Sequence, residues 1–205
     1  MSQWALDKLR ERFGVAVLET HSAFGDDTAI VDPRAWREVC LFLRDDPTLD
    51  FSLPVDLCGV DYPSSMAGAD RRGSGGRMEV VLHLYSIAKG HRIRLKTRVG
   101  DELMEGAELD SVTSVWPGLE WLEREVFDMS GVRFRGHPDL RRILMYPEFE
   151  GHPLQKTYPA AKTQPLVTYR TEASAGVPLD KVEPFDAYEG MSFGRHPEPQ
   201  PEEES

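Results

Sequence analysis

The stretch from His91 to Val99 constrains the fold of this chain most strongly. Apolar or small side chains alternate there with basic ones: Ile93, Leu95, Thr97 and Val99 against Arg92, Arg94, Lys96 and Arg98. A period of two places successive side chains on opposite faces of a β-strand. The sequence therefore predicts a strand with one buried and one open face, as in sheets that helices cover on one side only.

Periodicity and helix-breaking residues place further elements around this strand. We expect strands at residues 15–18, 28–31, 51–60 and 78–87, and helices at 4–13, at 33–45 and from Pro117 to about Met129. Asp32 before Pro33 is typical of a helix start, and Gly131 is typical of a helix end. This order predicts an α+β fold: a mixed, mainly antiparallel sheet with helices packed on one face, followed by an extended C-terminal arm.

The chain beyond Pro147 is rich in proline and carries aromatic residues spaced along it, with few periodic apolar runs. Such a segment cannot bury enough apolar surface to fold alone, so we expect residues 147–195 to order on a partner. We predict three parts: an α+β globular domain at 1–132, a motif segment with an extended partner-binding arm at 133–196, and a disordered acidic tail at 197–205.

Charge, hydropathy and cysteine content exclude several classes of function. The net charge of −11 argues against nucleic acid as a partner, because binding there needs a cationic surface. The sequence has no run of about eighteen apolar residues, which is the length that predicts a membrane-spanning helix. Residues 1–12 lack the apolar core of a signal peptide. Cys40 and Cys58 are not spaced as metal ligands, so we expect reduced thiols and no iron–sulfur cluster.

Three patterns could carry chemistry, and each has a simpler structural interpretation. Glu120, Arg124 and Asp128 stand four residues apart, which predicts a salt-bridged helix face, since neighbouring arginines lower carboxylate pKa values and disfavour acid–base catalysis. The glycines at 73–76 lack the Gly-Lys-Ser or Gly-Lys-Thr ending of a phosphate-binding loop. The basic face of 91–99 could bind an anion, but we favour solvation or strand-edge protection.

The tripeptide Gly-His-Pro occurs twice, at residues 136–138 and 151–153. His137 and His152 could be metal ligands or a proton relay. No third histidine or cysteine stands at ligand spacing, so we favour histidine rings that bond a backbone group or carboxylate at a chain corner. His83, in an apolar strand, is likewise interpreted as a residue of the sheet.

The block from Glu123 to Met145 is dense in charge yet nearly neutral, and it is interspersed with apolar anchors. Glu-Arg-Glu-x-Phe-Asp-x-x-Gly-Val-x-Phe-x-Gly-His-Pro-x-Leu-Arg-Arg-Ile-Leu resembles the signature of the C subunit of respiratory complex I, the family of the mitochondrial iron–sulfur protein 3. The resemblance continues through Gly151-His152-Pro153-Leu154-Gln155-Lys156-Thr157-Tyr158-Pro159. The segment Val60-Asp61-Tyr62-Pro63 resembles the family more loosely, and residues beyond about Leu166 carry little of it.

The resemblance implies a non-catalytic component of the peripheral arm of a proton-pumping NADH:quinone oxidoreductase, on the cytoplasmic side of the bacterial inner membrane. It implies no cofactor in this chain, because NADH, FMN, iron–sulfur clusters and quinone belong to other subunits. The implied partner is the D subunit, a hydrogenase-like protein that helps to form the quinone site, together with other peripheral-arm subunits. The implied interface and scaffold residues are Glu123, Arg124, Glu125, Asp128, Gly131, Phe134, Gly136, His137, Pro138, Leu140, Arg141, Arg142, Gly151, His152, Pro153, Lys156, Tyr158 and Pro159.

The sequence departs from the family pattern at three positions. Ser130 stands in place of an aromatic residue, Gln155 in place of arginine and Thr157 in place of aspartate. The last two together predict one missing ion pair. A related hydrogenase-type module is a close alternative, and a small metal-dependent hydrolase using His137 and His152 is a more distant one.

Overall fold

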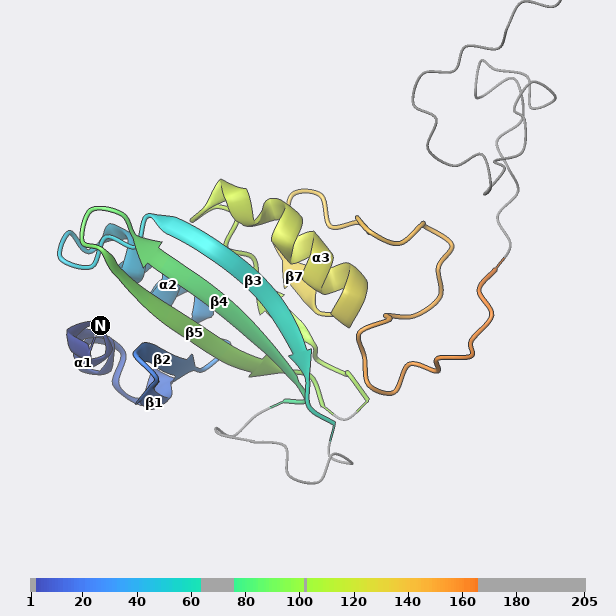
Figure 1. Cartoon of the computed structure of the whole chain (residues 1–205), viewed down its shortest axis with the longest axis horizontal. Helices are drawn as coiled ribbons and strands as arrows, with labels where there is room; N and C mark the ends of the chain where they lie inside the picture. Colours follow the sequence, from blue (N-terminus) through green and yellow to red (C-terminus); the bar gives the residue numbers. More distant parts are fainter. Residues whose placement is uncertain (1–2, 64–75, 102, 166–205) are drawn as a thin grey trace, which may run out of the picture. The chain divides into compact units, whose positions relative to one another are not determined.

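The computed structural model describes residues 3–63, 76–101 and 103–165. Its main feature is a five-stranded sheet in the order β1-β2-β5-β4-β3. The strands are β1 (Val17–Ala23), β2 (Asp26–Val31), β3 (Leu53–Asp61), β4 (Met78–Ser86) and β5 (His91–Val99). All neighbouring pairs are antiparallel except β2 and β5, which are parallel. The predicted mixed, mainly antiparallel sheet is therefore confirmed (Figure 1).

Three helices cover one face of this sheet: α1 (Gln3–Phe13), α2 (Trp36–Asp45) and α3 (Glu120–Ser130), with single 3-10 turns η1 (Gly14–Ala16) and η2 (Pro117–Leu119). Their inward side chains, such as Leu6, Trp36 and Val126, join one core cluster with Val80 and Leu95 of the sheet. Burial of this apolar surface is the main source of stability for the fold. The α+β class with helices on one face is thus confirmed.

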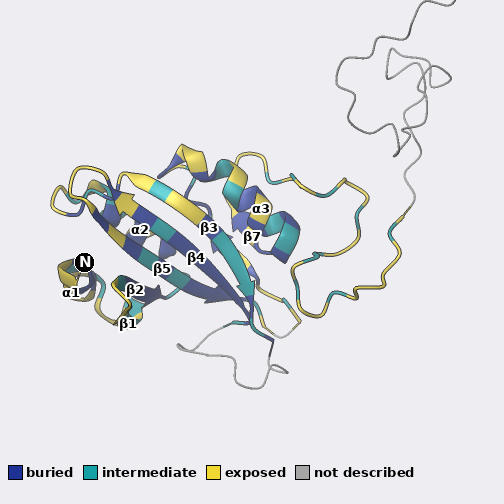
Figure 2. Cartoon of the chain, in the orientation of Figure 1, coloured by how far each residue is buried: buried dark blue, intermediate teal, exposed yellow. Residues whose placement is uncertain are grey.

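Strand β5 has the predicted alternation, with Ile93, Leu95 and Val99 buried (Figure 2). Its basic face is less exposed than a solvated face would be. Arg98 is buried and donates to Glu79 of β4 at 3.0 Å, and Lys96 donates to the same carboxylate at 2.8 Å. The cross-strand pairing of these side chains neutralises much of the basic stripe.

The start of α2 differs from the prediction that Asp32 caps a helix opening at Pro33. The helix begins at Trp36, and the Asp32 carboxylate accepts the Arg34 N–H at 2.8 Å within a preceding turn. An aspartate can bond the backbone two residues on as readily in a turn as in a helix cap, and here the turn is the outcome.

A second, two-stranded parallel sheet pairs β6 (Glu108–Asp110) with β7 (Arg133–Arg135). The sequence did not predict it, because three residues are too few to show a period. It ties the chain that follows α3 back to the segment that precedes η2.

The described chain after β7 has no helix or strand but is held by specific bonds. Leu154 N–H donates to Met129 O at 2.9 Å, and Lys156 N–H donates to the Asp61 carboxylate at 2.7 Å. Residues 151–158 therefore have partners within this chain, which differs from the expectation that order requires another subunit. The predicted arm beyond Pro165 and the acidic tail lie outside the described residues. Within the described ranges, no helix is long and apolar enough to cross a membrane.

Candidate functional site

Asp128, in the last turns of α3, organises the segment that carries the family-like motif. Its side chain is buried, and its Oδ2 accepts the backbone N–H groups of Ile143, Leu144 and Met145 at 3.1, 2.8 and 2.8 Å. Its Oδ1 accepts from Arg142 at 2.7 Å. Burial alone would raise the pKa of this carboxyl, but these donors outweigh burial and hold the pKa below its usual value.

Arg124, one turn earlier on α3, binds the same segment from the other side. Its Nε donates to the carbonyl of Arg141 and its Nη2 to that of Arg142, both at 3.1 Å. The predicted ladder of ion pairs along the helix is therefore wrong in its partners: Arg124 and Asp128 both reach to the 141–145 backbone. The Arg124 guanidinium binds backbone carbonyls of this segment, and the Asp128 carboxylate binds its backbone N–H groups.

The C-terminus of α3 is capped by the second Gly-His-Pro segment. Helix ends leave carbonyls without intrahelical donors. The carbonyls of residues 128, 129 and 130 accept from His152 Nδ1 at 2.8 Å, Leu154 N–H at 2.9 Å and Gln155 Nε2 at 3.0 Å. Gln155 thus has a capping role where the sequence predicted only a lost ion pair.

Gly131 makes this close approach possible. Its φ of +87° is left-handed, and a Cβ there would lie 2.8 Å from both Gln155 Nε2 and His152 Cδ2. Only glycine satisfies both requirements without a shift of the capping segment. The predicted helix end at this glycine is confirmed, and the structure adds the reason for it.

A buried ion pair anchors the end of the motif segment to the sheet. Arg77 donates to both oxygens of Asp61 at 2.7 Å, and also to Thr157 Oγ1 at 3.0 Å. Burial would raise the pKa of Asp61, but Arg77 and the Lys156 N–H hold it below its usual value. Thr157 therefore joins this ion pair as a neutral partner. Sequence reasoning missed Arg77, whose only signal was its place beside a predicted strand.

His137 and His152 have structural partners, as the favoured interpretation predicted. His137 Nδ1 accepts the Asp139 N–H at 3.0 Å, which leaves Nε2 to donate to the Glu120 carbonyl at 3.0 Å. Both nitrogens of that ring are engaged, so neither offers a free lone pair to a metal. Among the residues that the structure describes, no group of three or more His, Cys, Asp or Glu side chains could hold a metal ion.

Glu123 lies inside the protein rather than on the motif surface. Its side chain is fully buried, and its Oε1 accepts the Val112 N–H at 2.8 Å. Its Oε2 has no hydrogen-bond partner among the described residues. Burial raises the pKa of this carboxyl to about 7, against bonds from Ser111 and Val112 that lower it. In this chain the Glu123 carboxyl is therefore part of the core.

The eighteen motif residues divide by exposure. Four are buried and serve the fold: Glu123, Arg124, Asp128 and Phe134. Seven are half-buried: Gly131, His137, Leu140, Arg142, His152, Pro153 and Tyr158. Seven are exposed: Glu125, Gly136, Pro138, Arg141, Gly151, Lys156 and Pro159.

The outer surface of the motif segment carries apolar side chains beside a charge pair. Leu144, Tyr146 and Leu154 are exposed. Arg141 pairs with Asp139 at 2.7 Å, and both side chains are largely in solvent. We call this set (Asp139, Arg141, Leu144, Tyr146 and Leu154) the motif surface. Of these residues, arginine and tyrosine are types that are enriched at protein-binding surfaces.

Comparison with known proteins gives consistent matches over this part of the chain. A family model described as the 30-kDa subunit of respiratory-chain NADH dehydrogenase matches residues 29–164. A C subunit of NADH-quinone oxidoreductase from Rhizobium etli, numbered 2, is 43% identical over 152 residues, which cover 74% of each chain. The C subunit of the same enzyme from Mesorhizobium japonicum is 44% identical over 74% of this chain and 69% of the relative.

One solved structure is similar as well. A trypsin-resistant fragment of Nqo5, residues 1–134, superposes with a TM-score of 0.54 at 25% identity, and the match covers 67% of this chain and 98% of the fragment. Both the sequence family and the fold of the described domain therefore have established relatives.

Proposed function

The chain belongs to the family of the 30-kDa subunit of respiratory-chain NADH dehydrogenase, and on that premise we propose that it is a non-catalytic peripheral-arm component of a proton-pumping NADH:quinone oxidoreductase. Its role is to position the hydrogenase-like D subunit, which helps to form the quinone site, and so to support electron transfer from NADH to quinone. The protein is held on the cytoplasmic side of the bacterial inner membrane through the complex.

The observation that carries this proposal is the use of the motif residues. Among the described residues, the side chains of Arg124 and Asp128 bond to the backbone of the 141–145 segment and to Arg142, and the chain then caps α3 with residues 152–155. These contacts hold a segment without helix or strand in a fixed shape. A binding surface that is already ordered costs less conformational entropy on association. We infer that the motif serves a contact, since the charged groups of Arg124, Asp128 and Arg142 hold the shape of this segment.

The two motif arginines have different expected roles. Arg142 donates to Asp128 and to the Gly151 carbonyl at 3.0 Å, so its guanidinium holds the motif segment itself. Arg141 is exposed beside Asp139 and is the one that we expect to meet a carboxylate of the partner. An arginine suits such a contact because its planar fork binds carboxylates in two places.

The test is co-purification of the D subunit with the full-length chain carrying Arg141→Glu. We expect the yield of the D subunit to fall at least tenfold, while the thermal unfolding temperature of the isolated chain stays within about 2 °C. Arg34→Glu is the matched control, because Arg34 is a similarly exposed arginine, remote in sequence from the motif, beside Asp32. Recovery of the D subunit that is equal for both variants would refute the proposed contact.

We further propose that this chain binds no flavin, cluster or metal of its own. Both ring nitrogens of His137 are used, and Cys40 is buried, with a thiol pKa raised well above its usual value by burial. A visible absorption spectrum of the natively purified chain checks this directly. A flavin band or a stoichiometric metal would contradict it and would favour the hydrolase alternative.

A further inference from the structure

The residue at the tip of the β1–β2 hairpin is unfavourable for the turn that it forms. Phe24 and Gly25 form its two-residue turn, with φ angles of +55° and +85°. Such a turn favours asparagine or glycine, because positive φ strains other L-residues, bulky ones most. Phe24 is also fully exposed, at 105% of its reference area. Among the described residues nothing covers this side chain, so its strained backbone and its exposure point to a contact outside the described fold.

More exposed apolar residues lie at the same end of the sheet. Leu53 begins β3 and pairs with Tyr85 near the end of β4, and Ile87 follows in the turn to β5. The start of β2 pairs in parallel with the start of β5, which brings the hairpin tip to this end too. Val55 and Ile87 are 58% and 67% exposed. We call Phe24, Leu53, Val55, Tyr85 and Ile87 the hairpin-end surface.

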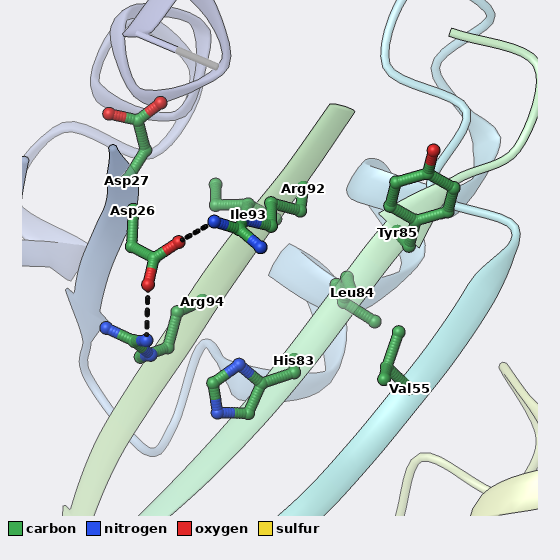
Figure 3. A pocket seen from close by; sticks show the side chains of 9 residues that line it. All are labelled: Asp26, Asp27, Val55, His83, Leu84, Tyr85, Arg92, Ile93 and Arg94. Carbon is green, nitrogen blue, oxygen red and sulfur yellow. Dashed lines mark hydrogen bonds and ion pairs between the residues drawn. The ribbon is translucent and has the colours of Figure 1, made fainter. Parts of the chain in front are cut away.

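A cavity of about 410 Å³, lined in part by Val55 and Tyr85, opens on the sheet face that carries none of the described helices. Figure 3 shows Arg92 and Arg94 of β5 reaching toward Asp26 of β2 on one side, with Tyr85 and Val55 on the other. The two arginines share that single carboxylate, at 2.7 and 3.0 Å. The side chain of Arg92 is 66% exposed, so a carboxylate of another protein can reach its guanidinium.

This surface lies away from the point where the motif segment joins the sheet. The motif segment attaches at the opposite end of β3, where Asp61 binds the Lys156 N–H. Leu53 and Asp61 are the two ends of that strand, about 26 Å apart at the usual rise per residue.

We propose that the hairpin-end surface docks a second protein of the assembly, one that presents an apolar socket for Phe24 and a carboxylate for Arg92. Aromatic and arginine side chains around a cavity are the composition of protein interfaces. Arg92, whose side chain is 66% exposed, supplies the cation that such a carboxylate would meet. Besides these structural observations, the proposal needs only that the chain belongs to the family of a complex subunit. It does not depend on the contact with the D subunit that is proposed for the motif surface.

The first test is Phe24→Asn in the full-length chain, expressed in cells that assemble the enzyme. Asparagine tolerates the positive φ, so the isolated chain is expected to unfold at the same or a higher temperature. The recovery of assembled enzyme is expected to fall at least fivefold. Val15→Asn is the control, because Val15 is 96% exposed but lies beside the opposite end of β1. Equal recovery of the two variants, or a lower unfolding temperature for Phe24→Asn, would overturn the proposal.

The second test compares the maleimide labelling rate of Ile87→Cys in the isolated chain and in the assembled enzyme, read by mass spectrometry of the peptide that contains residue 87. We expect at least tenfold slower labelling after assembly. Equal rates would overturn the proposal. Slow labelling already in the isolated chain would also overturn it, because another segment of this chain or a second copy would then cover the surface. Arg141→Glu changes a residue of the segment held on α3 by Arg124, and Phe24→Asn changes the hairpin tip, so either proposal can fail alone.

Discussion

Asp128 shows how one side chain can set the shape of a segment that has no regular structure. Its two oxygens take four donors from residues 142–145, and it is fully buried while doing so. Sequence reasoning placed it correctly in a helix but gave it the wrong partners. Its real partners follow it by 14 to 17 residues, in a segment without periodicity, and no local pattern reports such contacts.

Replacing Asp128 by Asn should therefore destabilise the chain strongly. The amide keeps one acceptor but loses the charge, so backbone N–H groups and Arg142 are left without full partners. We expect a loss of roughly 2–4 kcal/mol in the free energy of unfolding, measured by urea denaturation. Glu125→Gln, at an exposed position of the same helix, should change it by less than about 0.5 kcal/mol. Similar losses in the free energy of unfolding for both variants would show that Asp128 does not hold the 142–145 segment in place.

Glu123 makes a prediction about pH. Its pKa in the folded chain is about 7, above the ordinary 4.5, because burial disfavours the charge. The folded state therefore binds the proton more tightly. Its contribution to stability is complete below pH 4.5, declines as the pH rises to 7, and is lost above that.

Glu123→Gln removes this titration. We compare the free energy of unfolding of the parent chain with that of the variant. The parent value, relative to the variant, should decrease by about 3 kcal/mol as the pH rises from 4.5 to 8. Urea denaturation of both proteins across this range measures the difference, in which the titrations of shared groups cancel. A difference that stays constant with pH would show that the carboxyl titrates normally.

The helices and strands with the longest and most regular sequence patterns were the ones predicted best. Strand β5 and helix α3 were predicted closely, since one has a strict alternation and the other a proline before it and a glycine after it. The small β6–β7 sheet and the late start of α2 were not, because three-residue strands have no period and an aspartate–proline pair fits a turn as well as a helix. The capping of α3 depends on residues that follow it by more than twenty positions.

The junction of α3 with its capping segment can be tested at Gly131. Gly131→Ala adds a Cβ 2.8 Å from two capping side chains and strains a φ of +87°, so we expect a loss of about 1–3 kcal/mol in stability. Faster hydrogen exchange at the Leu154 N–H should accompany it, because that amide bonds to Met129 O. Gly118→Ala is the control, since no atom lies within 4 Å of the added Cβ and its φ is not left-handed. Equal effects at both glycines would exclude a special role for the junction.

At the scale of the whole molecule, we propose two separate contact surfaces. The motif segment joins the sheet where β3 ends, since the Lys156 N–H donates to Asp61, and the hairpin-end surface lies where β3 begins at Leu53. The family could be recognised from the sequence because its motif has a fixed order of residues. The surfaces could not be, since Phe24 and Ile87 belong to no motif and come together only through strand pairing.

The central claim is that the motif segment is held on α3 by this chain alone and forms a prepared surface for a partner. Hydrogen exchange of the isolated full-length chain tests this most directly. The Leu144, Met145 and Leu154 amides should be protected within about tenfold of those in β4, and Asp128→Asn should abolish the protection of Leu144 and Met145. Exchange of these amides within seconds in the isolated parent chain would contradict the account, because the segment would then gain its shape only from a partner.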